Sequence, residues 1–327
     1  MNPVRLLIRI AALFTLTFSA LAQGPSAPVT IGILAISGEL TARPYVEAFQ
    51  KRLQELGYAE PRAVRFLQRY ADSDPHKLRR LAGDLAEEGV AVIYAPATPE
   101  ALAAKAATRT IPIVFSNVND PVIVKLVESY NRPGGNVTGI AMDTNVLGAK
   151  RLQYLKELVP AAERMALLYD KDYADVCRLE LDQIRDSAKD LKIHLDLVPF
   201  EGSATLEAAL QRVSAGKPQA LMSPVSGTFA IDAVRIASFI SAQRLPALVE
   251  PHEAAAHGAV LSYGPDNLWA SRRAADYVAR ILKGTKPAAL PVERPTQYDL
   301  VINLKAAKAL GIKVPQTLLV RATRIIE

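Results

Sequence analysis

The sequence predicts an α/β protein made of two doubly wound sheets, and three observations support this. Short β-branched runs such as VTIGILAI (29–36) and IPIVFS (111–116) alternate with amphipathic segments. Such alternation predicts parallel strands joined by right-handed helical crossovers. The rhythm starts again after the turn RPGGN (132–136), and the 327 residues less 22 of a predicted leader, about 305, suffice for two domains.

The first half of the chain predicts five strands and four helices. The strands are expected over residues 29–36, 63–70, 90–95, 111–116 and 137–142. The helices are expected over residues 41–58, 75–88, 99–108 and, after Pro121 in the first turn, 122–130.

The second half repeats this pattern and then adds a tail. Strands are expected over residues 165–170, 193–198, 219–224 and 245–250, and helices over 145–158, 173–191, 204–214 and 229–243. The tail predicts a strand (259–264), a helix (266–283), a proline-rich linker, a strand (298–303) and a helix (304–311). These are too few for a third domain, so we expect them to join the first two sheets.

The N-terminus is typical of a cleaved secretory signal peptide over residues 1–22. Arg5 and Arg9 precede an apolar run over 10–18, and Ala20-Leu-Ala22 has the small-residue pattern of a cleavage site. A membrane anchor is the alternative, but it would need about 20 apolar residues. The sole cysteine, Cys177, cannot form an internal disulfide, which suits a bacterial periplasm.

The charge balance argues against nucleic acid as a partner. The formal charge of +6 falls to +4 when Arg5 and Arg9 are removed with the leader, and the other basic residues are scattered. We expect a monomer that binds a small molecule.

Polar residues follow the predicted strands, where loops of a parallel sheet converge on ligands. The candidate ligand-binding residues are Ser37, Glu39, Thr98, Asn119, Asp120, Asp143, Tyr169, Asp170, Ser226 and Glu250. Such residues are also common helix caps, and Thr98, Asp143, Asp172 and Ser226 could each be one. The prediction therefore concerns the candidate residues as a group, because in each sheet several of the loops that follow strands (the strand exits) contribute to it.

No recognisable catalytic, metal or cofactor motif accompanies these polar residues. The string HEAAAH (252–257) places its two histidines five residues apart, about 140° around a helix, so they cannot share a zinc ion. The sequence lacks a G-x-S-x-G elbow, a P-loop and a dinucleotide fingerprint. These observations predict a binding protein without cofactor or metal, rather than an enzyme.

Several stretches resemble the ABC-transporter substrate-binding family that includes tryptophan- and tyrosine-binding members. They are IPIVFSNVNDPV (111–122), LVESYNRPGGNVTGI (126–140), HGAVLSYG (257–264) and the tail ARILKGTKPAALPVERPTQYDLVINLKAAKALGIKVP (279–315). The resemblance covers residues 29–315 and matches Asp120 to an Asp-Pro motif, and Tyr263 and Gly264 to a Tyr-Gly motif near a crossing.

The resemblance implies a type I periplasmic-binding-protein fold, with two lobes that close on a small solute and deliver it to an inner-membrane permease. It implies lobe 1 over residues 28–141 and about 264–287, lobe 2 over 142–263 and about 288–327, and hinge crossings near 139–143, 262–266 and 285–295. A periplasmic sensor that presents the solute to a membrane receptor is the alternative function.

If the solute is an amino acid, strand-exit placement predicts a role for each group of residues. Asp120 or Asp170 would pair with its ammonium group, and Ser37, Thr98 or a helix N-terminus would bind its carboxylate. Tyr45, Tyr94 or Tyr169 would contact its side chain. Replacing Asp120 with Ala is expected to weaken solute binding at least tenfold, while the melting temperature stays close to that of the wild type.

Overall fold

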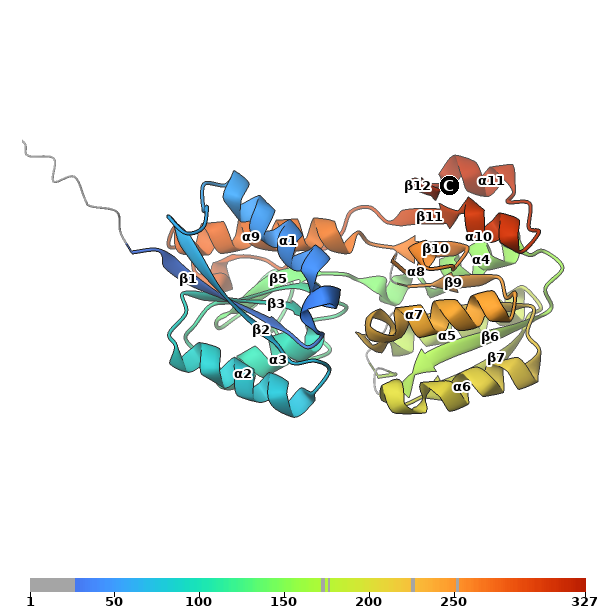
Figure 1. Cartoon of the computed structure of the whole chain (residues 1–327), viewed down its shortest axis with the longest axis horizontal. Coiled ribbons are helices and arrows are strands. Elements are labelled where there is room, and N and C mark those ends of the chain that lie inside the picture. Colours follow the sequence, from blue (N-terminus) through green and yellow to red (C-terminus); the bar gives the residue numbers. More distant parts are fainter. Residues whose placement is uncertain (1–26, 172–173, 176, 225–226, 251–252) are drawn as a thin grey trace, which may run out of the picture.

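The computed structural model describes residues 27–171, 174, 175, 177–224, 227–250 and 253–327, which form two lobes side by side (Figure 1). The predicted signal peptide (1–22) and the predicted site residue Ser226 lie outside these residues. None of the helices within the described ranges has the length and apolar character needed to cross a membrane.

The first lobe contains a fully parallel sheet with the strand order β2-β1-β3-β4-β5. These strands are β1 (Val29–Ala35), β2 (Val64–Tyr70), β3 (Val92–Ala97), β4 (Ile113–Val118) and β5 (Val137–Ala141). One face is covered by α1 (Glu39–Glu55) and α9 (Asn267–Leu282), and the other by α2 (Pro75–Glu87) and α3 (Thr98–Ala107). The tail helix α9 thus joins the first sheet.

An aromatic stack fixes α1 on this sheet. The rings of Phe49 and Tyr94 lie 4.0 Å apart between centroids and nearly parallel, and neither side chain is exposed. Burying such a side chain stabilises a fold by about 2–3 kcal/mol. Tyr94, a predicted contact for the side chain of a solute, is therefore a core residue, and its hydroxyl hydrogen-bonds to Ser116 Oγ at 3.0 Å.

The helix predicted over residues 122–130 is wrong, because this segment forms turns and bends. Its first residues include the β-branched run Val122-Ile123-Val124, which loses side-chain freedom in a helix. Lys125 then adopts a left-handed backbone conformation with φ of 57°, which a regular helix does not accommodate. The amides of Leu126 and Val127 both donate to the carbonyl of Pro121 and close a compact loop.

The second lobe has a seven-stranded sheet in the order β12-β11-β10-β9-β8-β6-β7. Its strands are β6 (Arg164–Asp170), β7 (His194–Phe200), β8 (Ala220–Ser223), β9 (Ala247–Val249), β10 (Leu261–Gly264), β11 (Asp299–Asn303) and β12 (Arg324–Ile326). Its helices are α4 (Gly148–Leu158), α5 (Arg178–Asp190), α6 (Gly202–Gly216), α7 (Gly227–Ala242), α8 (Glu253–Ala256), α10 (Leu304–Ala309) and α11 (Gln316–Arg321). The 3-10 turns η1 (Thr144–Val146) and η3 (Pro287–Ala289) complete the chain.

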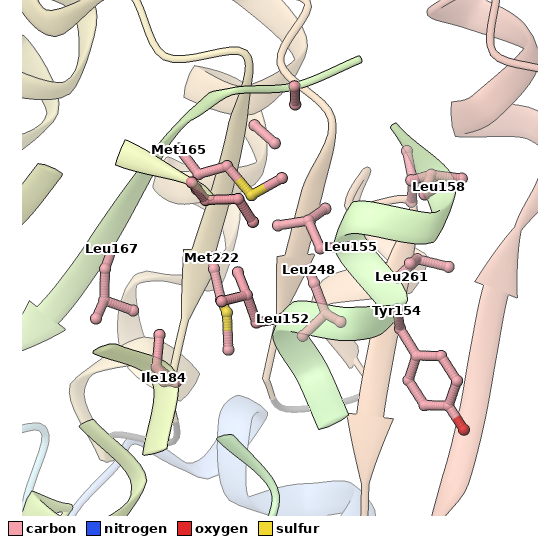
Figure 2. Close-up of a cluster of buried hydrophobic side chains, with 14 of the residues drawn as sticks. Leu152, Tyr154, Leu155, Leu158, Met165, Leu167, Ile184, Met222, Leu248 and Leu261 are labelled. Carbon is pink, nitrogen blue, oxygen red and sulfur yellow. The ribbon is translucent and has the colours of Figure 1, made fainter. Parts of the chain in front are cut away.

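The core between α4 and this sheet shows how the second lobe is held together (Figure 2). Leu152 and Leu155 of α4 point towards Met165 and Met222 of β6 and β8, and Leu158 belongs to the same buried cluster. On the opposite face, α6 and α7 cover the sheet through Leu206, Leu210, Ile236 and Ile240. Both faces are buried, as a largely parallel sheet requires.

Two details of the second lobe differ from the prediction. Strand β11 is antiparallel to β10, although the alternating pattern predicted parallel strands throughout. The chain enters β11 from the first lobe rather than through a helix of the second, so no right-handed crossover sets its direction. Helix α5 begins at Arg178, five residues later than predicted.

The chain passes between the lobes at residues 142–143, 265–266 and 294–298. Before the last passage, Glu293 forms a parallel bridge with Ile140 of β5, and Leu290 and Val292 lie in the cores of the first lobe. The segment that packs on the first sheet therefore extends beyond residue 287.

Gly139 provides a stability test for the passage from β5 to the second lobe. A Cβ atom at this position would lie 2.2 Å from the carbonyl oxygen of Phe115 and 2.7 Å from its ring, with φ at 157°. We expect Gly139→Ala to lower the free energy of unfolding by about 3 kcal/mol in urea titrations.

Gly83→Ala is the matched control, because Gly83 lies within α2 and a Cβ there meets nothing within 4 Å. We expect it to raise the free energy of unfolding by about 0.5–1 kcal/mol. Equal effects of the two substitutions would contradict the close approach of β5 to β4.

Candidate functional site

In both sheets the carboxyl ends of the strands face the other lobe, except those of β11 and β12, which run in the opposite direction. The chain leaves the first sheet from the carboxyl end of β5 and leaves the second from the carboxyl end of β10. Parallel neighbours of β5 and of β10 must end at the same edges. Strand exits from both lobes therefore line the region between the lobes, which is where ligands bind in open α/β sheets.

The side chain of Asn119 connects the loop after β4 with the first segment that passes between the lobes. Its side-chain amide nitrogen donates to Asn145 Oδ1 at 3.0 Å, and its oxygen accepts hydrogen bonds from the amide and hydroxyl of Thr144 at 2.8 and 2.6 Å. All three side chains are buried. The predicted site residue Asn119 thus has a structural role in tying the lobes together.

A second group of polar residues surrounds the crossings. Arg294 lies on the third crossing, donates to Asp143 Oδ2 on the first at 2.7 Å, and has its guanidinium 4.7 Å from the ring centre of Tyr130. Burial, followed by the charges of Asp120 and Asp143, raises the pKa of Tyr130. Asp143 forms no helix-capping hydrogen bond, so it is an ion-pair partner rather than a cap.

Asp120 is held by the backbone that follows it. Its Oδ1 accepts hydrogen bonds from the amides of Val122 and Ile123 at 2.9 and 3.0 Å. This capping arrangement is typical of an aspartate that starts a turn. The expectation that Asp120→Ala leaves the melting temperature unchanged therefore lacks structural support, because the substitution removes two hydrogen bonds.

The exits of β1 and β3 are joined by a residue that was not predicted. Glu100, in the first turn of α3, is 2% exposed, and its Oε1 accepts the amide hydrogen of Ile36 at 2.9 Å. Its Oε2 is buried and has no hydrogen-bond partner in the described part of the chain. Burial raises the pKa of Glu100 to about 7.

The predicted residues next to Glu100 occupy more open positions. Ser37 and Thr98 are half-buried, and Thr98 is the first residue of α3 rather than its cap. Glu39 begins α1 and is exposed, with Arg43 at 3.8 Å. Glu100 fixes the spacing between these two loops through Ile36.

In the second lobe, Arg151 lies among carboxylates at the strand exits. It is fully buried, donates to Glu180 and, through Nε, to the carbonyl of Tyr263 at 2.8 Å, and lies 3.6 Å from Glu250 Oε1. Glu250 Oε1 also accepts from Ser262 Oγ at 2.8 Å. Burial would lower the pKa of Arg151, but Glu180 and Glu250 raise it, so the guanidinium stays charged.

The remaining predicted residues end β6. Asp170 is buried and Tyr169 is half-buried beside the α4 core. Within the described ranges, no three His, Cys, Asp or Glu side chains are arranged to hold a metal ion.

Sequence reasoning missed Glu100, Tyr130, Arg151, Glu180 and Arg294. The sequence pattern could have revealed Arg151, because this charged residue lies on the same buried face of α4 as Leu155 and Leu158. Glu180 similarly lies among buried residues of α5. Arg294, in a linker, had no such signal.

Comparison with known proteins is consistent with this geometry. Residues 31–326 match the family model described as ABC transporter substrate binding protein. The chain belongs to this family.

Individual proteins are similar to this chain in sequence or in structure. A tyrosine-binding protein of Clostridioides difficile (strain R20291) is 26% identical over 269 residues, covering 82% of this chain and 76% of that protein. A conserved domain protein from Vibrio cholerae is 29% identical, with a TM-score of 0.82 over 91% of this chain and 99% of that one.

An ABC domain from Streptococcus pneumonia, in complex with L-Trp, is 22% identical and also has a TM-score of 0.82, over 91% of this chain and all (100%) of that one. The type I periplasmic-binding-protein fold is thus confirmed for this member of the substrate-binding family.

The raised pKa of Glu100 predicts a pH-dependent contribution to stability. The native state favours the protonated carboxyl, so the contribution is complete below the ordinary pKa of 4.5 and is lost as pH rises to about 7. In Glu100→Gln this loss is absent, while the amide oxygen can still accept from Ile36. We expect the variant to gain about 3 kcal/mol relative to wild type between pH 4.5 and 8.

Urea unfolding of both proteins across this pH range tests the prediction. Parallel stability profiles for the two proteins would show that Glu100 is ionised equally in the native and unfolded states.

Proposed function

We propose that this protein is the periplasmic solute-binding component of an ABC importer. It binds a small polar solute between the lobes and delivers it, chemically unchanged, to a permease in the inner membrane. One observation supports this proposal most strongly. In a member of the substrate-binding family, each sheet turns towards the other lobe the edge at which its parallel strands end and polar residues follow.

An amino acid is the solute class that the relatives favour. One relative is named a tyrosine-binding protein, and a solved structure of the same fold holds L-Trp. An amino acid offers an ammonium group, a carboxylate and a side chain, which the acidic, amide and aromatic groups at these edges can bind. The arginine-rich N-terminus with its apolar run supports export to the periplasm.

Solute binding is expected to change the angle between the lobes, because only the closed arrangement lets both edges contact one small molecule. Trp269 can report this change. It is the only tryptophan and lines a cavity beside the second and third crossings, together with Asp266, Pro295 and Asp299.

Native mass spectrometry of protein purified without denaturation should therefore reveal a bound metabolite. After its removal, re-addition should change Trp269 fluorescence and reduce the radius of gyration in X-ray scattering. A chain that binds no solute from a panel of amino acids, sugars and anions, and whose scattering never changes, would contradict the proposed function.

A pair of substitutions separates the charge of Asp120 from its role in the turn. Asp120→Asn keeps an oxygen for the amides of Val122 and Ile123, so its melting temperature should stay close to wild type, while Asp120→Ala should lose about 1 kcal/mol of stability. If Asp120 pairs with the ammonium of the solute, both variants should bind at least about tenfold more weakly in calorimetry. Unchanged affinity of Asp120→Asn would remove this carboxylate from the binding site.

A further inference from the structure

Glu100 differs from the buried carboxylates Glu180 and Glu250 because no charged group of the described residues compensates it. Glu180, equally buried, is bonded to Arg151, and Glu250 has the same arginine at 3.6 Å. For Glu100, the influences on ionisation are burial and two backbone hydrogen bonds, without any charged side chain of the described residues. Buried charges in folded proteins are almost always paired.

The charge of Glu100 acts on one titratable side chain of β3. This is Tyr94 of β3, whose own pKa is raised to about 12 mainly by burial, and which therefore stays neutral. No charged side chain of β1, α2 or β4 acts on the Glu100 carboxyl in the described part of the chain. The Glu100 carboxyl can therefore avoid an uncompensated charge in two ways: it can take up a proton, or a cationic ligand can balance it.

A neighbouring group at the same edge also lacks a partner among the described residues. Asn117 Oδ1, in β4, is buried and accepts no hydrogen bond from them, and Asn117 is in register with Ala97, three residues before Glu100. Both unpaired atoms are oxygens that accept hydrogen bonds, since Glu100 Oε2 is an acceptor when ionised. This edge therefore favours a ligand that brings donors and positive charge.

The opposite edge also carries buried acidic side chains. Asp170 ends β6 and Glu250 follows β9, and both are buried, as is Glu180 of α5. Arg151 is bonded to Glu180 and lies 3.6 Å from Glu250. Acidic groups thus lie near the strand ends of both lobes.

We propose that the solute carries a cationic nitrogen, such as an ammonium group, and that Glu100 supplies its counter-charge by releasing a proton when the solute binds. This inference rests on the proposed function. The step is balanced: the carboxyl of Glu100 ionises, its proton passes to solvent, and the charge of the solute replaces it in the closed site. A charge acts over several ångströms in a poorly solvated site, so direct contact is not required.

Calorimetry with L-tyrosine, and with the other standard L-amino acids, tests this in phosphate and in Tris buffer. These buffers differ in heat of protonation, so the difference in binding heat gives the protons released. With Glu100 near pKa 7, we expect release of about 0.9 proton at pH 6, 0.5 at pH 7 and 0.1 at pH 8. Affinity should rise about tenfold from pH 6 to pH 8.

Two controls isolate the side chain and the ligand group. Glu100→Gln should bind without proton release and with an affinity that does not change from pH 6 to pH 8, whereas Glu47→Gln, on the exposed face of α1, should match the wild type. The deamino analogue 3-(4-hydroxyphenyl)propanoate lacks the ammonium and should release no proton.

The possible outcomes separate this inference from the proposed function. Amino-acid binding without proton release, or with the same release in Glu100→Gln, overturns the role of Glu100 and leaves the binding function intact. Binding of neutral D-glucose or D-sorbitol in preference to every amine overturns the cationic class alone. If nothing binds and native mass spectrometry finds no retained solute, both proposals fail.

Discussion

In each lobe, the chain first crosses to the other lobe from the carboxyl end of a strand, namely β5 in the first lobe and β10 in the second. Hydrogen bonding between parallel neighbours then forces the adjacent strands to end at that same edge. This constraint places Asn119 and Asp120 after β4, and Glu100 after β3, at one edge of the first sheet, and Asp170 and Glu250 at the corresponding edge of the second. Helices on both faces of each sheet bury the apolar side chains, so these edges are where polar groups gather.

Glu100 and Arg151 show two ways in which such an edge can hold buried charge. Arg151 is balanced within the protein, because Glu180, Glu250 and the carbonyl of Tyr263 accept or surround its guanidinium. Among the described residues, Glu100 is stabilised by two backbone amides, and burial raises its pKa to about 7. The first arrangement keeps Arg151 charged, whereas the second makes the charge of Glu100 depend on pH near neutrality.

Much of the fold could be predicted from the periodicity of apolar residues, because the local sequence pattern shows which side of each strand or helix is buried. The direction of β11 could not, since it depends on a chain that arrives from the other lobe. The segment after Pro121 misled the prediction because its apolar pattern suits a helix, while Lys125 breaks the backbone path. Asp120 and Asn119 were placed at the correct edge, but their hydrogen bonds could not be foreseen.

The contacts of Glu100 and Arg151 span 64 and 112 residues of sequence, to Ile36 and Tyr263 respectively. No local pattern encodes such distances, so their roles appear only in the folded chain. For the predicted site residues, the sequence indicated which strand exits they follow, and the structure adds which of them already serve as caps, ion pairs or ties between crossings.

The two ends of the folded chain belong to different lobes: β1 opens the first, while β12 closes the edge of the second (Figure 1). Fluorescent proteins fused before β1 and after β12 would therefore be attached to different lobes. Any rotation between the lobes would alter energy transfer between the two fluorophores, so a change of the interlobe angle can be followed without cutting or permuting the chain.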